Sequence, residues 1–398
     1  MRVFYGQAVY GEEEIAAVTD VLRNQSLALM TGPKVAEFEN KIAALFGKKF
    51  GLMVNSGSSA NLLAFAALDL PKGSEVITPA LTFATTVSPL LQLGLVPVFC
   101  DVEPDSYVVD TKRIDALIGP KTKALMIPNL IGNLPDWVEI RRIADRNGLY
   151  VIEDSCDTLG ATVSGRPTGA LADISVTSFY ASHVVTAAGF GGMVTMNDEI
   201  LARRATLLRG WGRSSSLMGE SESIDARFNA EIDGIPYDSK FIFEGVGYNF
   251  LPSEIGAAFG LAQLAKLEGF IQQREANFKT LLDFFAKFEG WFLLPRQRDE
   301  VRTGWLAFPL IVRPEAPFTR RDLQIHFEKK DIQTRTVFTG NILRQPGFKN
   351  IPHRADPKGL ANADRVMQGG ILIGCHQGLD AKALAYVQES FLALAEKF

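Results

Sequence analysis

Short apolar runs alternate with helical patterns along the first half of the chain, and this alternation restricts the possible folds more than any other feature of the sequence. The runs lie at residues 51–54, 75–78, 97–102, 124–128, 149–153 and 174–179. They are mostly apolar rather than alternating, as expected for strands that are buried on both faces. The pattern predicts an α/β fold with a mostly parallel sheet that helices cover on both sides.

Helical patterns predict where the covering elements lie. The expected helices span residues 11–24, 35–46, 137–147, 201–208, 253–285 with a break, 320–329 and 381 onward. Residues 213–240 are polar and irregular, and we interpret them as a long loop. Residues 291–398 mix strand and helix patterns, which predicts a smaller α+β domain.

Residues 178–194 combine an apolar run, a histidine and a glycine-rich turn. The turn contains Gly189, Gly191 and Gly192, and a second apolar run follows it. Glycines at a reversal between two strands let another group approach the backbone closely. His183 stands at the start of the turn. It is either a catalytic group or a loop histidine without a chemical role, and the residues alone leave both interpretations open.

A cluster of small residues follows the first strand-like run. Residues 55–62 read NSGSSANL. Hydroxyls and free N–H groups at such a helix start suit a bound phosphate, and they equally suit a serine that caps the helix. Asp154, Asp157 and His183 also follow strand-like runs. Because ligands of parallel sheets bind at the carboxyl ends of strands, we expect these three side chains to share one rim.

Composition and charge exclude several classes of function. The net charge of −4 offers no basic surface for nucleic acid. Residues 76–100 carry no charge but contain prolines, threonines and a glutamine, so we interpret them as buried strand, loop, helix and strand rather than as a membrane span. The three cysteines are far apart and too few to ligate an iron–sulfur cluster, and the four histidines lack metal-ligand spacing. We expect a cytoplasmic protein without a metal site.

Six ordered motifs make the sequence resemble the DegT/DnrJ/EryC1/StrS family of sugar aminotransferases, which are fold-type I pyridoxal-phosphate enzymes. The motifs are TGPKVAEFE at 31–39, NSGSSANL at 55–62, IEDSCDTLGA at 152–161, SFYASH at 178–183, GYNFLPSEIGAAFGLAQL at 247–264 and TGNILRQPGF at 339–348. The resemblance implies a mostly parallel seven-stranded sheet in a large cofactor-binding domain at 1–250. It also implies a long connecting helix and a small C-terminal domain at 251–398, and a homodimer.

The resemblance also reveals a departure at the position of the catalytic lysine. In the family this residue lies five positions after the serine of the SF motif and forms a Schiff base with the cofactor. Here the position holds His183, and no lysine occurs between Lys123 and Lys240. An imidazole cannot hold the cofactor covalently, but it can move a proton. The exchange is similar to the one in the 3-dehydratase branch of the family.

The remaining expected site residues take their roles from the resemblance. Asp154 would pair with the protonated pyridine nitrogen of pyridoxal or pyridoxamine phosphate. Phe83 would stack on the cofactor ring, and Asp157 would lie near that ring. His376 is interpreted as structural.

The phosphate of the cofactor needs several donors, because no covalent link retains it. By family position, Gly57, Ser58 and Ser178 would supply them. Asn249 would reach the same phosphate from the second subunit of the dimer.

The resemblance implies a reaction that removes the C3 hydroxyl from a nucleotide-linked 4-keto-6-deoxy sugar, with glutamate as the amino donor that regenerates pyridoxamine phosphate. The CDP-sugar enzymes of this branch carry an iron–sulfur cluster, whereas in this chain no cysteine follows the motif at Trp211–Arg213 closely. We therefore expect a cluster-free 3-dehydratase. The alternatives are a dehydratase that depends on an external iron–sulfur partner, a non-catalytic protein that binds a sugar nucleotide or cofactor, and an aminotransferase, which the missing lysine disfavours.

Overall fold

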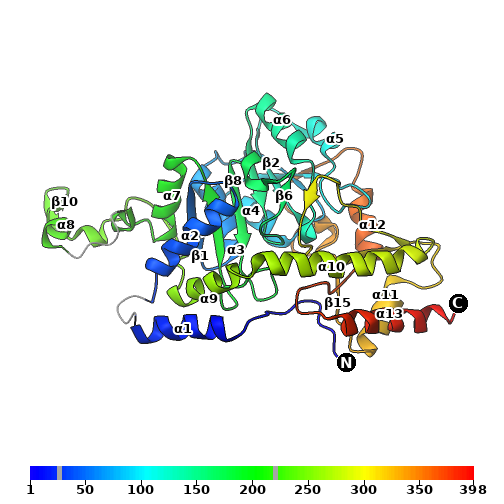
Figure 1. Ribbon diagram of the computed structural model, residues 1–398. Helices are drawn as coiled ribbons and strands as arrows, with labels where there is room; N and C mark the ends of the chain where they lie inside the picture. Colours follow the sequence, from blue (N-terminus) through cyan, green and yellow to red (C-terminus); the bar gives the residue numbers. More distant parts are fainter. Residues whose placement is uncertain (25–28, 218–222) are drawn as a thin grey trace.

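The computed structural model describes residues 1–24, 29–217 and 223–398, and an eight-stranded sheet lies at its centre (Figure 1). The strand order is β1, β9, β8, β5, β4, β2, β3, β16. The strands are β1 Phe50–Val54, β2 Glu75–Pro79, β3 Val96–Cys100, β4 Thr122–Pro128, β5 Tyr150–Asp154, β8 Ile174–Ser178, β9 Gly192–Met196 and β16 Arg354–Ala355. β9 pairs antiparallel with β1 and β8, and the other neighbours are parallel. This confirms the mostly parallel sheet.

One strand more than the expected seven is present in this sheet. Seven strands come from residues 50–196, and the eighth, β16, comes from the C-terminal part of the chain and pairs with the edge strand β3. β16 has only two residues, so it is too short to leave a periodicity in the sequence. The division of the chain at residue 250 stays a prediction.

Both faces of the sheet are buried, which explains the continuous apolar runs. In β4, Ala124 and Met126 pack on one face, whereas Leu125 and Ile127 pack on the other. The first face is covered by α3, α4 and α7, and the second by α5 and α6, with α2 and α9 at the β1 edge. These helices are α2 Pro33–Leu45, α3 Gly57–Leu68, α4 Ala84–Gln92, α5 Thr111–Ile114, α6 Trp137–Asn147, α7 Glu199–Arg209 and α9 Glu254–Leu264.

A second, antiparallel sheet forms the smaller α+β unit, as predicted. Its order is β12, β14, β17, β15, with bounds Phe292–Leu293, Phe308–Val312, Gly370–Ile373 and Thr334–Thr336. The long helix α10 (Leu267–Phe285) leads into this unit, which also contains α11 (Arg320–Lys329), α12 (Ala361–Gly369) and α13 (Ala381–Ala395) (Figure 1). A small third sheet joins β13 (Val301–Arg302) to β6 (Thr162–Val163) and β7 (Arg166–Pro167).

An arm that projects from the body replaces the predicted long loop (Figure 1). Within residues 213–240 the chain forms α8 (Ile224–Phe228) and a hairpin of β10 (Ala230–Ile232) and β11 (Ile235–Tyr237), while residues 218–222 lie outside the described residues. Asp233 and Gly234 both have positive φ, 52° and 81°, and connect the two strands. An Asp-Gly pair is a strong hairpin signal in a sequence, so the interpretation of this segment as a loop was wrong.

Most other predicted elements match the structure closely. The helices predicted at 137–147 and 320–329 coincide with α6 and α11, and the one at 11–24 corresponds to α1 (Glu12–Asn24), which packs on α9. Residues 76–100 form most of β2, then α4 and β3, as expected. In the described part of the chain, no helix is both long and apolar enough to cross a membrane.

Candidate active site

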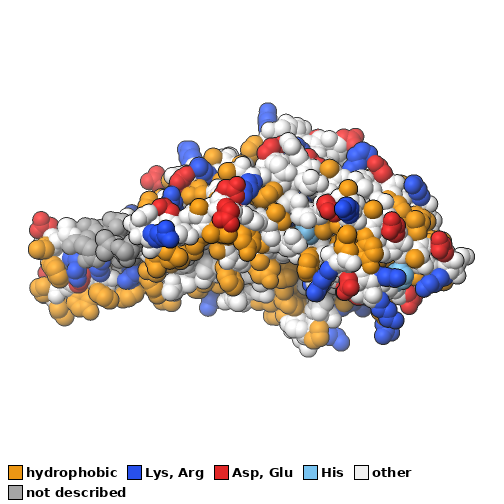
Figure 2. Space-filling view, turned by 60° about the horizontal axis from the view of Figure 1, so that its bottom comes forward, with side chains coloured by type: hydrophobic (Ala, Val, Ile, Leu, Met, Phe, Trp, Pro, Cys, Tyr) orange, Lys and Arg blue, Asp and Glu red, His pale blue; other side chains and the backbone are white. Residues whose placement is uncertain are grey.

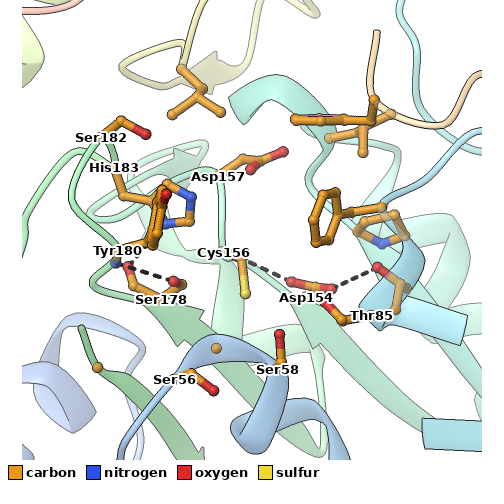
Figure 3. A pocket seen from close by; sticks show the side chains of 18 of the residues that line it. Ser56, Ser58, Thr85, Asp154, Cys156, Asp157, Ser178, Tyr180, Ser182 and His183 are labelled. Atoms are coloured by element: carbon orange, nitrogen blue, oxygen red, sulfur yellow. Dashed lines mark hydrogen bonds between the residues drawn. The ribbon is translucent and has the colours of Figure 1, made fainter. Parts of the chain in front are cut away.

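A cavity of about 440 Å³ opens at the carboxyl ends of the parallel strands. All predicted site residues except Asn249 line it, namely Gly57, Ser58, Phe83, Asp154, Asp157, Ser178 and His183. Figure 3 shows Asp154 and Asp157 entering from the end of β5, and His183 from the loop after β8. The expectation that these three side chains share one rim therefore holds. Asn249 is exposed and pairs with Gly210 at the base of the arm, outside the lining of this cavity.

The N-terminus of α3 forms the floor of the cavity. Ser56 caps the helix, because its Oγ accepts a hydrogen bond of 3.1 Å from the backbone N of Ser59. The first N–H groups of a helix have no partner within it, and here Gly57 and Ser58 line the cavity. Capping and anion binding are thus compatible at this helix start. Ser178 Oγ accepts a bond of 3.3 Å from the backbone N of Tyr180, which leaves its own proton for a ligand.

The glycine-rich reversal approaches this floor closely. A Cβ at Gly192 would lie 2.4 Å from the carbonyl oxygen of Ser56 and 2.6 Å from the backbone N of Gly57. Gly189 and Gly191 have φ of 100° and 142°, a region that only glycine occupies easily. These glycines therefore allow the chain's own backbone at the start of α3 to approach closely.

Three donors hold the carboxylate of Asp154. Its Oδ2 accepts bonds from Asn61 Nδ2 at 3.0 Å and from Thr86 Oγ1 at 2.9 Å, and its Oδ1 accepts from the backbone N of Cys156 at 3.1 Å. The side chain is buried, with 6% of its surface exposed. Donors to both oxygens fix the direction of the carboxyl group. Asp154 can therefore pair with a cationic nitrogen of a bound ligand.

His183 presents a free, neutral ring nitrogen. Its Nδ1 lies 3.3 Å from the carbonyl oxygen of Ser178. Because a carbonyl only accepts hydrogen bonds, Nδ1 carries the proton and Nε2 keeps its lone pair. Burial lowers the pKa of His183 to about 4, so the ring is uncharged at neutral pH. The ring of Tyr180 lies edge-on, with 5.8 Å between centroids, and limits its rotation.

Asp157 has a different environment from Asp154, although only two residues separate them. Its Oδ2 accepts one bond of 2.8 Å, from the backbone N of Ile131. Burial and the neighbouring charge of Asp154 raise the pKa of Asp157 to about 7. Ile131 has φ 60° and ψ 10°, which is rare for a β-branched residue and costs about 1–3 kcal/mol. A strained peptide thus holds this carboxyl.

Sequence reasoning missed several lining residues. Tyr5 reaches the cavity from the N-terminal segment, which is held on the small unit by a bond from its backbone N to Gln333 Oε1 at 3.0 Å. Tyr180 and Phe338 also line the cavity. No periodicity connects Tyr5 to a site that lies 150 residues away. Tyr180, in contrast, stands within the SFYASH motif and could have been included.

Comparisons with known proteins show the family of this chain. Residues 9–392 match the model of the DegT/DnrJ/EryC1/StrS aminotransferase family. The chain is 38% identical over 91% of its length to lipopolysaccharide biosynthesis protein RfbH of Salmonella typhimurium, covering 85% of that protein. It is 36% identical over 98% of its length to dTDP-4-dehydro-2,6-dideoxy-D-glucose 3-dehydratase of Saccharopolyspora spinosa, covering 86% of it.

A solved structure shows the same fold. It is E. coli GDP-4-keto-6-deoxy-D-mannose-3-dehydratase with bound hydrated PLP, which is 28% identical, with a TM-score of 0.86 over 98% of this chain and 100% of that one. The fold is therefore that of the fold-type I pyridoxal-phosphate enzymes. The chain belongs to the DegT/DnrJ/EryC1/StrS aminotransferase family.

Proposed function

We propose that this protein removes the C3 hydroxyl from a nucleotide-linked 4-keto-6-deoxyhexose, using pyridoxal and pyridoxamine phosphate. The observation that carries the proposal is His183, whose free Nε2 borders the cavity at the position where the family's lysine would stand. Among the described residues, no lysine lines this cavity. Two relatives that bear the name of 3-dehydratases, described above, support the same reaction class.

The residues of the cavity fit such a cofactor. Its phosphate suits the N–H groups of Gly57 and Ser58 at the start of α3 and the hydroxyl of Ser178. Asp154, held by its three donors, suits the protonated pyridine nitrogen. Phe83 is about half exposed and borders the cavity, where it can cover the face of a planar ring.

The chain's own residues bind the cofactor and move protons. The bound cofactor supplies an electron sink for the carbon–oxygen cleavage. Asp154 would keep the ring of the cofactor protonated, and the helix start would hold its phosphate without a covalent link. Nε2 of His183 would take up the proton at C4′ of the cofactor. Glutamate would be the source of the amino group of the amine form.

We further propose that the reaction needs no iron–sulfur cluster on this chain. Cys100 and Cys375 are fully buried, and Cys156 alone borders the cavity. Cys156 lies between the two aspartates (Figure 3), where burial raises the pKa of its thiol well above the usual range. A protonated single thiol is a poor ligand for a cluster.

We propose a homodimer, with the arm as a contact between the two copies. Apolar side chains on and beside the arm face outward, including Ile224, Ile235, Phe243 and Val246, which is 97% exposed. Figure 2 shows hydrophobic atoms along the lower side of the molecule, from the arm to the body. A second copy would cover this surface and bring Asn249 to the other cavity. Light scattering should show a dimer, and Val246→Asp should weaken it.

The first test follows the absorbance of the protein with pyridoxal phosphate before and after glutamate is added. We expect the aldehyde band to convert to an amine band, with release of 2-oxoglutarate. A panel of GDP-, CDP- and dTDP-linked 4-keto-6-deoxyhexoses is then offered, and release of ammonia together with the 3-deoxy sugar supports the proposal. Stable transfer of the amino group to the sugar would instead indicate an aminotransferase.

Other outcomes identify the remaining alternatives. Dehydration that starts only when an iron–sulfur reductase is added indicates a partner-dependent enzyme. Binding of the cofactor or sugar nucleotide without any conversion indicates a non-catalytic binding protein. His183→Asn is the matched variant in each assay, because it removes the base and preserves a small polar side chain.

A further inference from the structure

The second carboxyl of the cavity, Asp157, is built differently from the one that suits the cofactor nitrogen. Asp154 accepts three hydrogen bonds, whereas Oδ2 of Asp157 accepts one, from Ile131. Asp157 is partly exposed and lines the cavity, as His183 does (Figure 3). A carboxyl that accepts few hydrogen bonds and faces the cavity is better suited to donate a proton than to pair with a charged group.

The backbone that holds Asp157 is specialised for this contact. Ile131 and Gly132 both have positive φ, 60° and 88°. The carbonyl oxygen of Ile131 accepts a bond of 2.8 Å from the backbone N of Leu306, and a Cβ at Gly132 would lie 3.0 Å from that same nitrogen. The hydrogen bond from Leu306 thus fixes the strained backbone at Ile131, and the N–H of Ile131 points at Oδ2 of Asp157. Strain of this kind is concentrated at functional sites.

The groups around Asp157 favour a neutral carboxyl. They are Asp154 and Cys156 on its own segment, Tyr5 from the N-terminal segment and His183 from the loop after β8. Burial lowers the pKa of His183 and raises the pKa of Tyr5 beyond its usual range, so neither ring carries a charge at neutral pH. Arg274 acts on Tyr5 and His183 and Arg335 on Tyr5, whereas the raised pKa of Asp157 comes from its burial and from the charge of Asp154.

We propose that Asp157 is the general acid that protonates the departing C3 hydroxyl, an inference that rests on the proposed dehydration. Nε2 of His183 accepts one proton from C4′. The C3–O bond breaks while the carboxyl of Asp157 gives its proton to that oxygen, and water leaves. One proton is taken up and one is given, and no external oxidant or reductant is needed. His183 and Asp157 thus divide the two proton transfers between them.

The test compares two leaving groups in Asp157→Asn. The substrates are the nucleotide ketosugar that the wild type converts and its 3-deoxy-3-fluoro analogue, whose fluoride leaves without a proton from the protein. We expect Asp157→Asn to lose roughly 10²- to 10⁴-fold in dehydration rate and to release fluoride at close to the wild-type rate. The glutamate half-reaction, followed by absorbance, reports separately whether the cofactor site of the variant is formed.

Two control variants separate the role of Asp157 from a general loss of activity. His183→Asn should lose both eliminations, and Asp145→Asn, an exposed carboxylate on α6, should lose neither. Equal loss of water and fluoride release in Asp157→Asn would overturn the inference, as would an unchanged dehydration rate. A wild type that eliminates neither group would overturn the proposed function and this inference with it.

Discussion

The buried imidazole of His376 should make the stability of the protein depend on pH in a defined window. Its Nε2 lies 3.2 Å from the carbonyl oxygen of Phe4, and its Nδ1 accepts a bond of 3.2 Å from the backbone N of Gly378. The ring is fully buried, and both nitrogens are satisfied only in the neutral form. Burial, aided by the charge of Arg274, lowers the pKa of His376 from 6.5 to about 4.

The size of the loss in unfolding free energy follows from the lowered pKa of His376. The unfolded chain binds a proton at this histidine between pH 6.5 and pH 4, whereas the folded chain does not, so acidification favours the unfolded state. A lowering of the pKa of His376 from 6.5 to about 4 corresponds to about 3 kcal/mol of unfolding free energy. That stability is fully present above pH 6.5 and is lost progressively as the pH falls from 6.5 through 4.

Urea unfolding at a series of pH values, followed by tryptophan fluorescence, measures the effect. Between pH 7 and pH 4, the wild type should lose about 3 kcal/mol more than His376→Gln, because the variant lacks the titrating ring. His353→Gln is the matched control, since His353 is exposed, and it should follow the wild type. Parallel curves for the wild type and His376→Gln would refute the reasoning.

Three further predictions concern the cavity. His183→Asn should abolish turnover, a loss of at least about 10²-fold, while the absorbance of bound pyridoxal phosphate persists; undiminished turnover would contradict its role as base. Thr86→Val removes a donor to Asp154 and should weaken pyridoxal phosphate binding by roughly 5- to 100-fold, the equivalent of about 1–3 kcal/mol, in a fluorescence titration; unchanged affinity would remove Asp154 from the cofactor site. Gly192→Ala would place a Cβ 2.4 Å from the carbonyl oxygen of Ser56, so both the melting temperature and phosphate affinity should fall; wild-type values for both would show that the backbone can shift freely.

Local patterns in the sequence predict most of the large sheet and its helices. The apolar runs at 124–128 and 149–153 correspond to β4 and β5 within one or two residues, because strands buried on both faces must be continuously apolar. The same reasoning fails for β16, which pairs with β3 from more than 250 residues away. It also fails for the arm, where the polar character of the segment masked the Asp233-Gly234 turn.

The candidate site shows the same division between local and distant information. Motifs identify Asp154, Asp157 and His183 because each follows a strand, and strands of one sheet end at a common edge. The N-terminal segment carries no such relation to the sheet. Tyr5 reaches the cavity only because its backbone is bonded to Gln333 of the small unit, a contact that no local pattern specifies.

The different roles proposed for the two aspartates could not be derived from the motif EDSCD itself. Both are carboxyls of the same segment, and their chemistry diverges through partners from elsewhere in the chain. Asn61 on α3 and the hydroxyl of Thr86 on α4 donate to Asp154, whereas Asp157 receives a single N–H from the strained peptide at Ile131. The proposed roles of ion pair and acid therefore depend on the topology that brings α3 and α4 to one aspartate and not to the other.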